Sequence, residues 1–174
     1  MSSVEKEKVM KVRELMSSIV HTCRAQDGLD RAAGLLWEHD CGMLPVVDGE
    51  GRVGAVITDR DLCMAAFTRG RRLDEIPVAE AMSSSLVSCT ADEDLTAAVR
   101  RMVEHQVHRL PVVDEQQRPC GVLSLNDLAG AAATDRRIVR PAMDVLIAVS
   151  HHRCEVPAPV EAAAVPQQEA HAKQ

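Results

Sequence analysis

One internal repeat constrains the fold of this chain more than any other feature. The segment Leu44-Pro45-Val46-Val47-Asp48 recurs 66 positions later as Leu110-Pro111-Val112-Val113-Asp114. The same offset aligns further identical residues without a gap, among them Val12/Val78, Glu14/Glu80, Met16/Met82, Cys23/Cys89, His39/His105 and Asp61/Asp127. Self-similarity at one fixed offset over most of a chain indicates tandem duplication. The chain must therefore fold as two similar units.

Both copies predict the same order of elements. Each contains a helix whose apolar residues keep the spacing of one helical face, Leu29, Ala32, Ala33 and Leu36 in the first copy and Leu95, Ala98, Val99 and Met102 in the second. A short apolar step at Ile19-Val20 precedes the helix in the first copy. After the helix we expect a strand that starts at Pro45, a Gly- and Asp-rich turn, and a second strand over 53–57, with its counterpart over 121–125. Another helix then begins near Leu62 and Leu128.

These patterns predict an α/β (α+β) fold of two β-α-β-β-α repeats, related by a pseudo-twofold axis and packed sheet to sheet, because one such unit is too small to bury its own core. We expect an N-terminal arm over 1–11, repeats over 12–68 and 78–134, and a linker over 69–77. An extension over 135–156 would hold a short amphipathic helix through Met143, Leu146 and Ile147 that ends near Ser150. The Ala-, Pro- and Gln-rich residues 157–174 predict a disordered tail.

Composition argues against several classes of partner. The chain has one Trp, one Phe and no Tyr, whereas proteins that bind single-stranded nucleic acids stack bases on several aromatic rings. The net charge of −6 also argues against a phosphate-backbone partner. No apolar run approaches the roughly 18 residues of a membrane span. Six Cys without a leader-like N-terminus predict a reduced, cytoplasmic protein.

Three motifs of the first copy, 10–16, 44–48 and 56–62, resemble a cystathionine-β-synthase-type (CBS) domain, and the two copies together resemble a Bateman module. The resemblance covers about residues 10 to 134 in order. It implies a regulatory sensor, not an enzyme, that binds an adenosine-containing ligand in clefts between the repeats. The implied ligands are AMP, ADP or ATP, with S-adenosylmethionine as the alternative. It also implies a homodimer and an unidentified regulated protein. We expect the dimer contact at the faces of Leu62, Ala65 and Ala66 and of Leu128, Ala131 and Ala132.

Thr58-x-x-Asp61 and Ser124-x-x-Asp127 carry the chemistry that best fits such a ligand. Each pair falls where a strand meets a helix, and a helix N-terminus offers free N–H donors to a phosphate. In similar proteins the hydroxyl binds phosphate and the carboxylate holds the ribose hydroxyls. The same spacing is also a plain capping pair, and the two roles can coexist.

The copies differ just before the shared Pro, where the first copy has Gly42-Met43 and the second has His108-Arg109. In similar domains this pair lies near the phosphates, and arginine grips phosphate where methionine cannot. Because the chain has few aromatic side chains, adenine would lie between aliphatic side chains such as Val20 and Val87 and backbone amides. The candidate ligand site comprises Val20, Thr22, Met43, Pro45, Thr58, Arg60, Asp61, Val87, Ser88, His108, Arg109, Pro111, Ser124, Asn126 and Asp127. A surface salt bridge remains the alternative for Arg109.

Two other functions stay open. The chain can be a scaffold whose clefts have lost their ligand, or a thiol or metal sensor. The recurring Cys23 and Cys89 have the pattern of small core residues, and His151-His152-Arg153-Cys154 is a weak metal motif. We expect Trp37 to be a packing residue, His39 to be solvated at a helix end, and the Arg-rich 69–72 to be a solvated linker. No P-loop, nucleophile–base pair or metal-spaced ligand set is visible.

Overall fold

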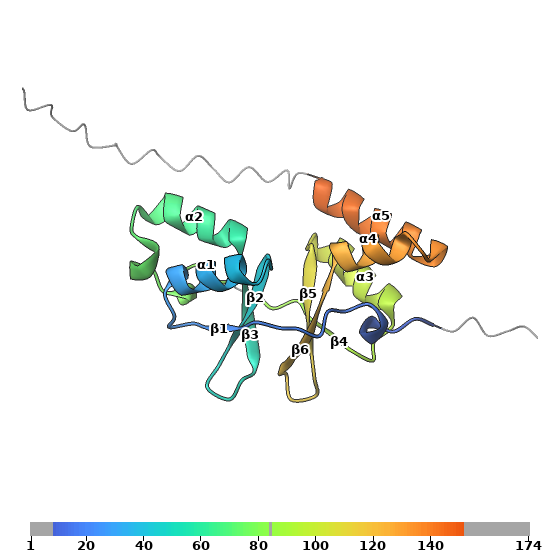
Figure 1. The fold of residues 1–174 in the computed structure, drawn as a ribbon, viewed down its shortest axis with the longest axis horizontal. Coiled ribbons are helices and arrows are strands. Elements are labelled where there is room, and N and C mark those ends of the chain that lie inside the picture. Colours follow the sequence, from blue (N-terminus) through green and yellow to red (C-terminus); the bar gives the residue numbers. More distant parts are fainter. Residues whose placement is uncertain (1–8, 84, 152–174) are drawn as a thin grey trace, which may run out of the picture.

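The computed structural model describes residues 9–83 and 85–151, which form two similar halves side by side (Figure 1). The first half contains β1 (Cys23–Arg24), α1 (Leu29–Glu38), β2 (Met43–Val47), β3 (Val53–Thr58) and α2 (Asp59–Arg69). The second contains β4 (Cys89–Thr90), α3 (Leu95–His105), β5 (Arg109–Val113), β6 (Pro119–Ser124) and α4 (Leu125–Ala132). Short 3-10 helices η1 (Val12–Glu14), η2 (Leu73–Glu75) and η3 (Val78–Glu80) and a last helix α5 (Arg136–Ser150) complete them. The predicted fold class and the element order of both repeats are confirmed.

Each half has a three-stranded mixed sheet. The strand order is β1-β2-β3 in one sheet and β4-β5-β6 in the other, with the first pair parallel and the second antiparallel. The predicted strand start at Pro45 was wrong by two residues, because β2 begins at Met43 and Pro45 lies inside it. Pro45 is tolerated there since β1 pairs only with Val46 and Val47. The end of the last strand was also misplaced, because Leu125 is the first residue of α4.

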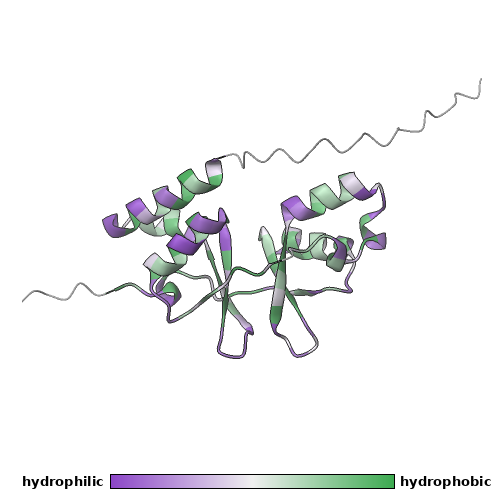
Figure 2. Ribbon diagram, turned by 180° about the vertical axis from the view of Figure 1, so that it is seen from behind, coloured by the Kyte–Doolittle hydropathy of each residue, from purple (hydrophilic) through white to green (hydrophobic). Residues whose placement is uncertain are grey.

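The strands and helices enclose two separate cores. Strand residues are hydrophobic through the middle of both sheets, and the hairpin tips are hydrophilic (Figure 2). One core surrounds Leu44 and Ile57 of the first half, and the other surrounds Leu110 and Leu123 of the second. Each of these side chains is fully buried. The apolar helix faces that the sequence predicted, including Leu29 and Leu95, pack into these cores.

The two halves exchange the segments that precede their first strands. Val12 packs in the core of the second half, and its counterpart Val78 packs in the core of the first. The backbone repeats the exchange: the Val12 N–H donates to the Glu93 carbonyl at 3.0 Å, and the Val78 N–H donates to the Asp27 carbonyl at 2.8 Å. Each sequence copy therefore completes the core of the other, which binds the halves into one body.

The C-terminal extension forms a longer helix than the sequence predicted, and a different face of it is buried. α5 spans Arg136–Ser150 and contains Pro141. It packs on both α3 and α4 through an inner stripe, Ile138, Ala142, Val145 and Ala148. The residues expected to anchor it, Met143, Leu146 and Ile147, are instead half exposed. The helix has two apolar stripes, and periodicity alone could not say which one is buried.

Two expectations about exposed surfaces were wrong. Leu62, Ala65 and Leu128, which we assigned to a dimer contact, are buried in the cores of their own halves. Trp37, assigned to packing, is 88% exposed. The predicted tail over 157–174 lies outside the described residues. Among the helices of the described ranges, none is long and apolar enough to cross a membrane.

Candidate functional site

A hollow of about 340 Å³ lies between the two halves and is the candidate site. The first half supplies the segment before β1, with Val20 and His21, and the segment that leads into β2, with Gly42 and Met43. The second half supplies Arg109 from β5 and the β6–α4 junction. Six predicted site residues meet here: Val20, Met43, Arg109, Ser124, Asn126 and Asp127. Because both halves line it, a molecule bound here would touch both repeats.

The β6–α4 junction is held by a reciprocal cap. The Asp127 N–H donates to Ser124 Oγ at 3.2 Å, and the Ser124 N–H donates to Asp127 Oδ2 at 2.7 Å. The Ser124 hydroxyl also donates to Asp127 Oδ2 at 2.6 Å. Thr58 and Asp61 form the same box at the start of α2. The capping role is therefore present in both copies. Within the described part of the chain, Asp127 Oδ1 accepts no hydrogen bond, so this oxygen remains available to a ligand.

Arg109 lies across the cleft against Gly42. A Cβ placed on Gly42 would stand 2.6 Å from Arg109 Nη2 and 2.8 Å from Cζ, so a larger residue there would displace the guanidinium from this position. The side chain is partly buried, and it forms no ion pair with any residue in 9–83 or 85–151. The salt bridge weighed as an alternative is thus not seen among these residues. A guanidinium without a carboxylate partner in a cleft is a natural anion site.

Two imidazoles that sequence reasoning did not place in the site line the same hollow. His21 and His39 are stacked, with ring centroids 3.4 Å apart and ring planes 3° from parallel. His39 is exposed at the end of α1, as expected for a solvated helix end, but it also faces the cleft. The hollow thus has imidazole rings in its lining beside the aliphatic Val20. Nothing in the local pattern relates these two histidines, since only the fold brings them together.

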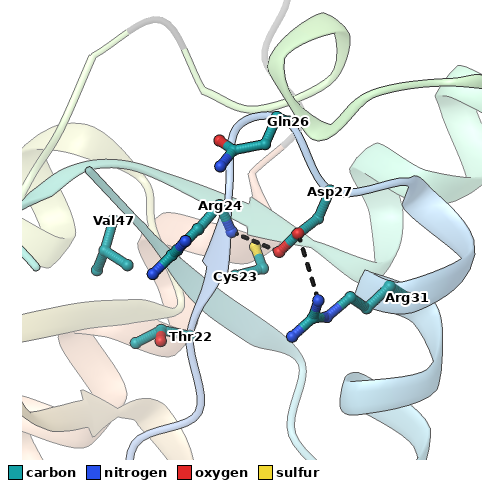
Figure 3. A pocket seen from close by; sticks show the side chains of 7 residues that line it. All are labelled: Thr22, Cys23, Arg24, Gln26, Asp27, Arg31 and Val47. Carbon is teal, nitrogen blue, oxygen red and sulfur yellow. Dashed lines mark hydrogen bonds and ion pairs between the residues drawn. The ribbon is translucent and has the colours of Figure 1, made fainter. Parts of the chain in front are cut away.

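Thr22 lies in a different hollow from the residues above. Figure 3 shows it beside Arg24, Asp27 and Arg31 in a space of about 450 Å³. There the Arg24 N–H donates to Asp27 Oδ2 at 2.8 Å, and Arg31 contacts the other carboxylate oxygen at 3.5 Å. The carboxylate is thus engaged by the protein itself, so this hollow is a weaker candidate.

The remaining predicted residues lie outside the hollow of Arg109. Pro45 and Pro111 are buried inside β2 and β5. Arg60 is exposed in the first turn of α2. Val87, Ser88 and His108 precede β4 and β5 in the second half, and the Ser88 carbonyl accepts from Arg101 Nη1 at 2.6 Å. Val87, His108, Thr58 and Asp61 occupy positions equivalent to those around Arg109, where Met43 replaces the arginine, and Ser88 is the counterpart of Thr22.

Cys23 and Cys89 have the environment of core residues. Burial raises the pKa of the Cys23 thiol to about 11 and that of Cys89 to about 12, with Asp27 and Glu93 adding to the effect. Burial also raises the pKa of Cys41, which lines the cleft, and the Arg109 charge opposes that rise. Raised pKa values mean little reactive thiolate. In the ranges described, no three potential metal ligands gather, and Cys154 lies outside them.

Thiol labelling should follow this order of burial. At pH 8 we expect iodoacetamide to modify the exposed Cys63 first, and Cys23 about 100-fold more slowly, because two pH units separate its pKa from the ordinary value of 9.0. Peptide mapping by mass spectrometry measures both rates. The folded thiols stay protonated while unfolded thiols ionise, so their contribution to stability should fall as the pH rises from about 9 to 12. Equal labelling of Cys23 and Cys63 would favour a thiol sensor.

Two exchanged β-α-β-β-α repeats share a cleft, and Thr/Ser-x-x-Asp caps the helix at both strand–helix junctions, so the fold defines a tandem-repeat module. The family model for the CBS domain matches residues 12–67 and 78–134. This chain belongs to the CBS domain family, and its two domains form a Bateman module.

Sequences similar to this chain occur in two kinds of protein. The chain is 36% identical over 118 residues to the CBS domain-containing protein YhcV of Bacillus subtilis, which covers 68% of this chain and 82% of YhcV. It is also 31% identical over 117 residues, 67% of this chain, to a homoserine O-acetyltransferase of Methanococcoides burtonii, but this covers only 23% of that enzyme. Similar pairs thus occur both in small proteins and as part of an enzyme.

Solved structures share the fold. The CBS domain pair of protein MJ0100, in complex with 5′-methylthioadenosine and S-adenosyl-L-methionine, superposes with a TM-score of 0.66 at 22% identity over 72% of this chain and 97% of that one. CBSX2 in complex with AMP superposes with a TM-score of 0.61 at 27% identity over 71% of this chain and 96% of that one. Both of these CBS pairs were solved with adenosine-containing ligands.

Proposed function

We propose that this protein is a regulatory module that binds an adenine nucleotide, AMP, ADP or ATP, in the cleft lined by Arg109 and Asp127. It has no catalytic role of its own, works in the cytoplasm as a homodimer, and reports nucleotide level to a regulated protein as an energy sensor. The observation that carries the ligand assignment is the guanidinium of Arg109, which lies against Gly42 without a carboxylate partner among the described residues. The AMP complex of the similar CBSX2 supports the choice of nucleotide.

In this proposal each residue of the cleft contacts a different part of the ligand. Arg109 holds the phosphate, because its planar donors match phosphate oxygens. Asp127 Oδ1 accepts from the ribose hydroxyls, while Oδ2 keeps the helix cap. The adenine lies toward Val20 and the edge of the His21–His39 stack. S-adenosylmethionine offers no phosphate to Arg109, and so it is the weaker ligand in this assignment.

The proposed signal follows from the shape of the site. A ligand that touches Val20 in one half and Asp127 in the other stabilises one relative orientation of the halves. A ligand shifts such an equilibrium only by its differential affinity for the two orientations. At a ligand concentration of 100 times Kd, binding adds about 2.7 kcal/mol to the free energy of unfolding. Saturating nucleotide should therefore raise the melting temperature by several degrees.

Calorimetric titration with adenosine, AMP, ADP, ATP and S-adenosylmethionine tests this function, and Asp127→Asn is the diagnostic variant. We expect the nucleotides to bind more tightly than adenosine or S-adenosylmethionine. The variant should weaken both adenosine and nucleotide by about 10-fold, because a hydrogen bond to a charged group contributes about 1.5–3 kcal/mol and the amide keeps part of it. Asp61→Asn, at the equivalent cap, is the matched control.

The same variants separate binding from capping. If Asp127 and Asp61 only cap their helices, both variants should have a lower melting temperature and an unchanged ligand affinity. Absence of binding by every ligand in the panel would favour the scaffold without a ligand.

A further inference from the structure

The stacked rings of His21 and His39 are the part of the cleft whose charge changes most readily. They lie face to face, with ring centroids 3.4 Å apart, and both line the hollow of Arg109. Neither imidazole makes a hydrogen bond or an ion pair with another residue of 9–83 or 85–151. We call these two side chains the imidazole stack. Its protonation is therefore set by the charges that surround it in the hollow and by the charge of a bound molecule.

The two copies of the repeat differ at the imidazole stack. His39 has a counterpart in His105, but the residue equivalent to His21 is Val87. The second copy therefore has no imidazole with which His105 could form the same pair. The stack, like Arg109 at the position of Met43, distinguishes one side of the module from the other.

The end of α1 holds His39 where a positive charge is favoured. His39 is the last residue of the helix turn, and its N–H donates to the Leu35 carbonyl at 3.2 Å. Asp40 then adopts a left-handed conformation with φ of 47°, which ends α1 and leads the chain to Gly42, against Arg109. The carbonyl end of a helix stabilises a cation, so His39 lies where an imidazolium is favoured by the backbone.

The other charged groups that line the hollow are acidic in balance. Asp40 and Asp127 carry two negative charges against the one positive charge of Arg109, a net charge of −1 while both imidazoles are neutral. Cys41 adds no charge, because burial raises the pKa of its thiol above the ordinary value of 9.0. Glu38 precedes His39 on α1 but does not line the hollow. The lining without a proton on the stack is thus poorly matched to an anion.

A nucleotide alters this balance in favour of one additional proton. A phosphate monoester brings about 1.5 to 2 negative charges at pH 7. Opposite charge stabilises the protonated form of a neighbouring imidazole. Two cations whose ring centroids are 3.4 Å apart would repel each other strongly, so the stack accommodates one proton more easily than two. Binding and protonation should therefore favour each other.

We infer that the imidazole stack takes up a proton when a nucleotide binds, so that this cleft binds phosphate-bearing ligands more tightly as the pH falls from 8 to 6.5. The inference rests on the proposed nucleotide site and adds its regulation by pH. Imidazole is the side-chain group that ordinarily changes charge between pH 5 and 8. The bound anion stabilises the charged ring, so the complex keeps its proton to a higher pH than the free protein. The gain in affinity is then present at low pH and is lost as the pH rises past the point where the complex releases that proton.

Calorimetric titration of the full chain with AMP and with adenosine tests this inference. If binding moves the titration of one imidazole by about one pH unit, AMP should bind about 5-fold more tightly at pH 6.5 than at pH 8.0. The same shift gives an uptake of roughly 0.5 proton per AMP at pH 7. Repeating the titration in buffers of different ionisation enthalpy measures the uptake. Adenosine carries no phosphate, so its affinity should stay constant over this range.

Variants of the stack show whether the proton resides there. The double variant His21→Val/His39→Gln removes both imidazoles, and its valine is the residue that the second copy has at Val87. It should lose the uptake and bind AMP at pH 6.5 about as the parent does at pH 8.0. His39→Arg fixes the charge and should bind AMP at pH 8.0 about as tightly as the parent at pH 6.5, with little uptake. His151→Gln removes an imidazole that lines the hollow between α3 and α5, and it should behave like the parent.

The remaining outcomes distinguish this inference from the proposed function. A parent chain that binds AMP without taking up protons overturns the inference and leaves the nucleotide site in place. Absence of AMP binding at every pH overturns both. If the double variant keeps the uptake of the parent, another group receives the proton and the stack is not the sensor. If adenosine shows the same pH dependence as AMP, the proton does not respond to the phosphate, which also overturns the inference. The measurement on the parent needs no variant, so it decides even if the double variant fails to fold.

Discussion

Replacing Arg109 by alanine should weaken AMP, ADP and ATP binding by about 10- to 100-fold and leave adenosine binding unchanged. A charge-assisted hydrogen bond to phosphate contributes about 1.5–3 kcal/mol, and adenosine has no phosphate to lose. The effect should be near the upper end because the guanidinium forms no ion pair with a carboxylate of residues 9–83 or 85–151. Calorimetry with nucleotide and nucleoside on the same protein measures both values.

Three further variants make this result specific. Arg118→Ala removes the same charge from an exposed hairpin turn and should change neither affinity. Gly42→Ala puts a methyl group within 3.0 Å of three guanidinium atoms of Arg109, so that side chain must move and nucleotide affinity should fall by several-fold. Gly34→Ala, where an added Cβ meets nothing within 4 Å, is its control. If Arg109→Ala binds nucleotide as the parent does, phosphate binds elsewhere.

Leu110→Ala should lower the free energy of unfolding by about 2–5 kcal/mol, the range for removing a buried leucine from a packed core. Leu110 is fully buried as the second residue of β5, and its counterpart Leu44 holds the same place in β2. Leu44→Ala should therefore cost a similar amount. Urea denaturation followed by circular dichroism measures both changes.

The control for the core variants is Leu146→Ala, since that side chain is 44% exposed on α5. It should change the free energy of unfolding by less than about 1 kcal/mol under monomeric conditions. A small effect of Leu110→Ala, equal to that of Leu146→Ala, would contradict the packing of the second core.

Local periodicity was enough to predict the repeat units but not their packing partners. The spacing of Leu29 and Leu95 marked core helices, because a helix shows its buried side every three to four residues. The same rule failed for α5, which has apolar residues on two sides. It also could not show that Val12 packs in the second half, since a pattern within one segment does not say which distant segment covers it.

The candidate site was predictable only where a motif carried it. Ser124 and Asp127 were visible through their fixed spacing, and Arg109 through its difference from Met43 at the equivalent position. The stacking of His21 on His39 had no such signal, because one residue precedes β1 and the other ends α1. The exposure of Trp37 was missed for a related reason. An apolar residue on a helix is usually packed, and the sequence does not show that no other segment of the described structure covers this one.

The exchange of Val12 and Val78 also suggests what the module was before its gene doubled. A single ancestral unit carrying one such segment would have left its own core open, and it could close that core only by trading segments with an identical neighbour. Duplication then joined the two neighbours in one polypeptide, which turned a concentration-dependent association into a permanent one. Once the partners were covalently linked, the two sides of the shared cleft were free to diverge, and one now has Met43 where the other has Arg109.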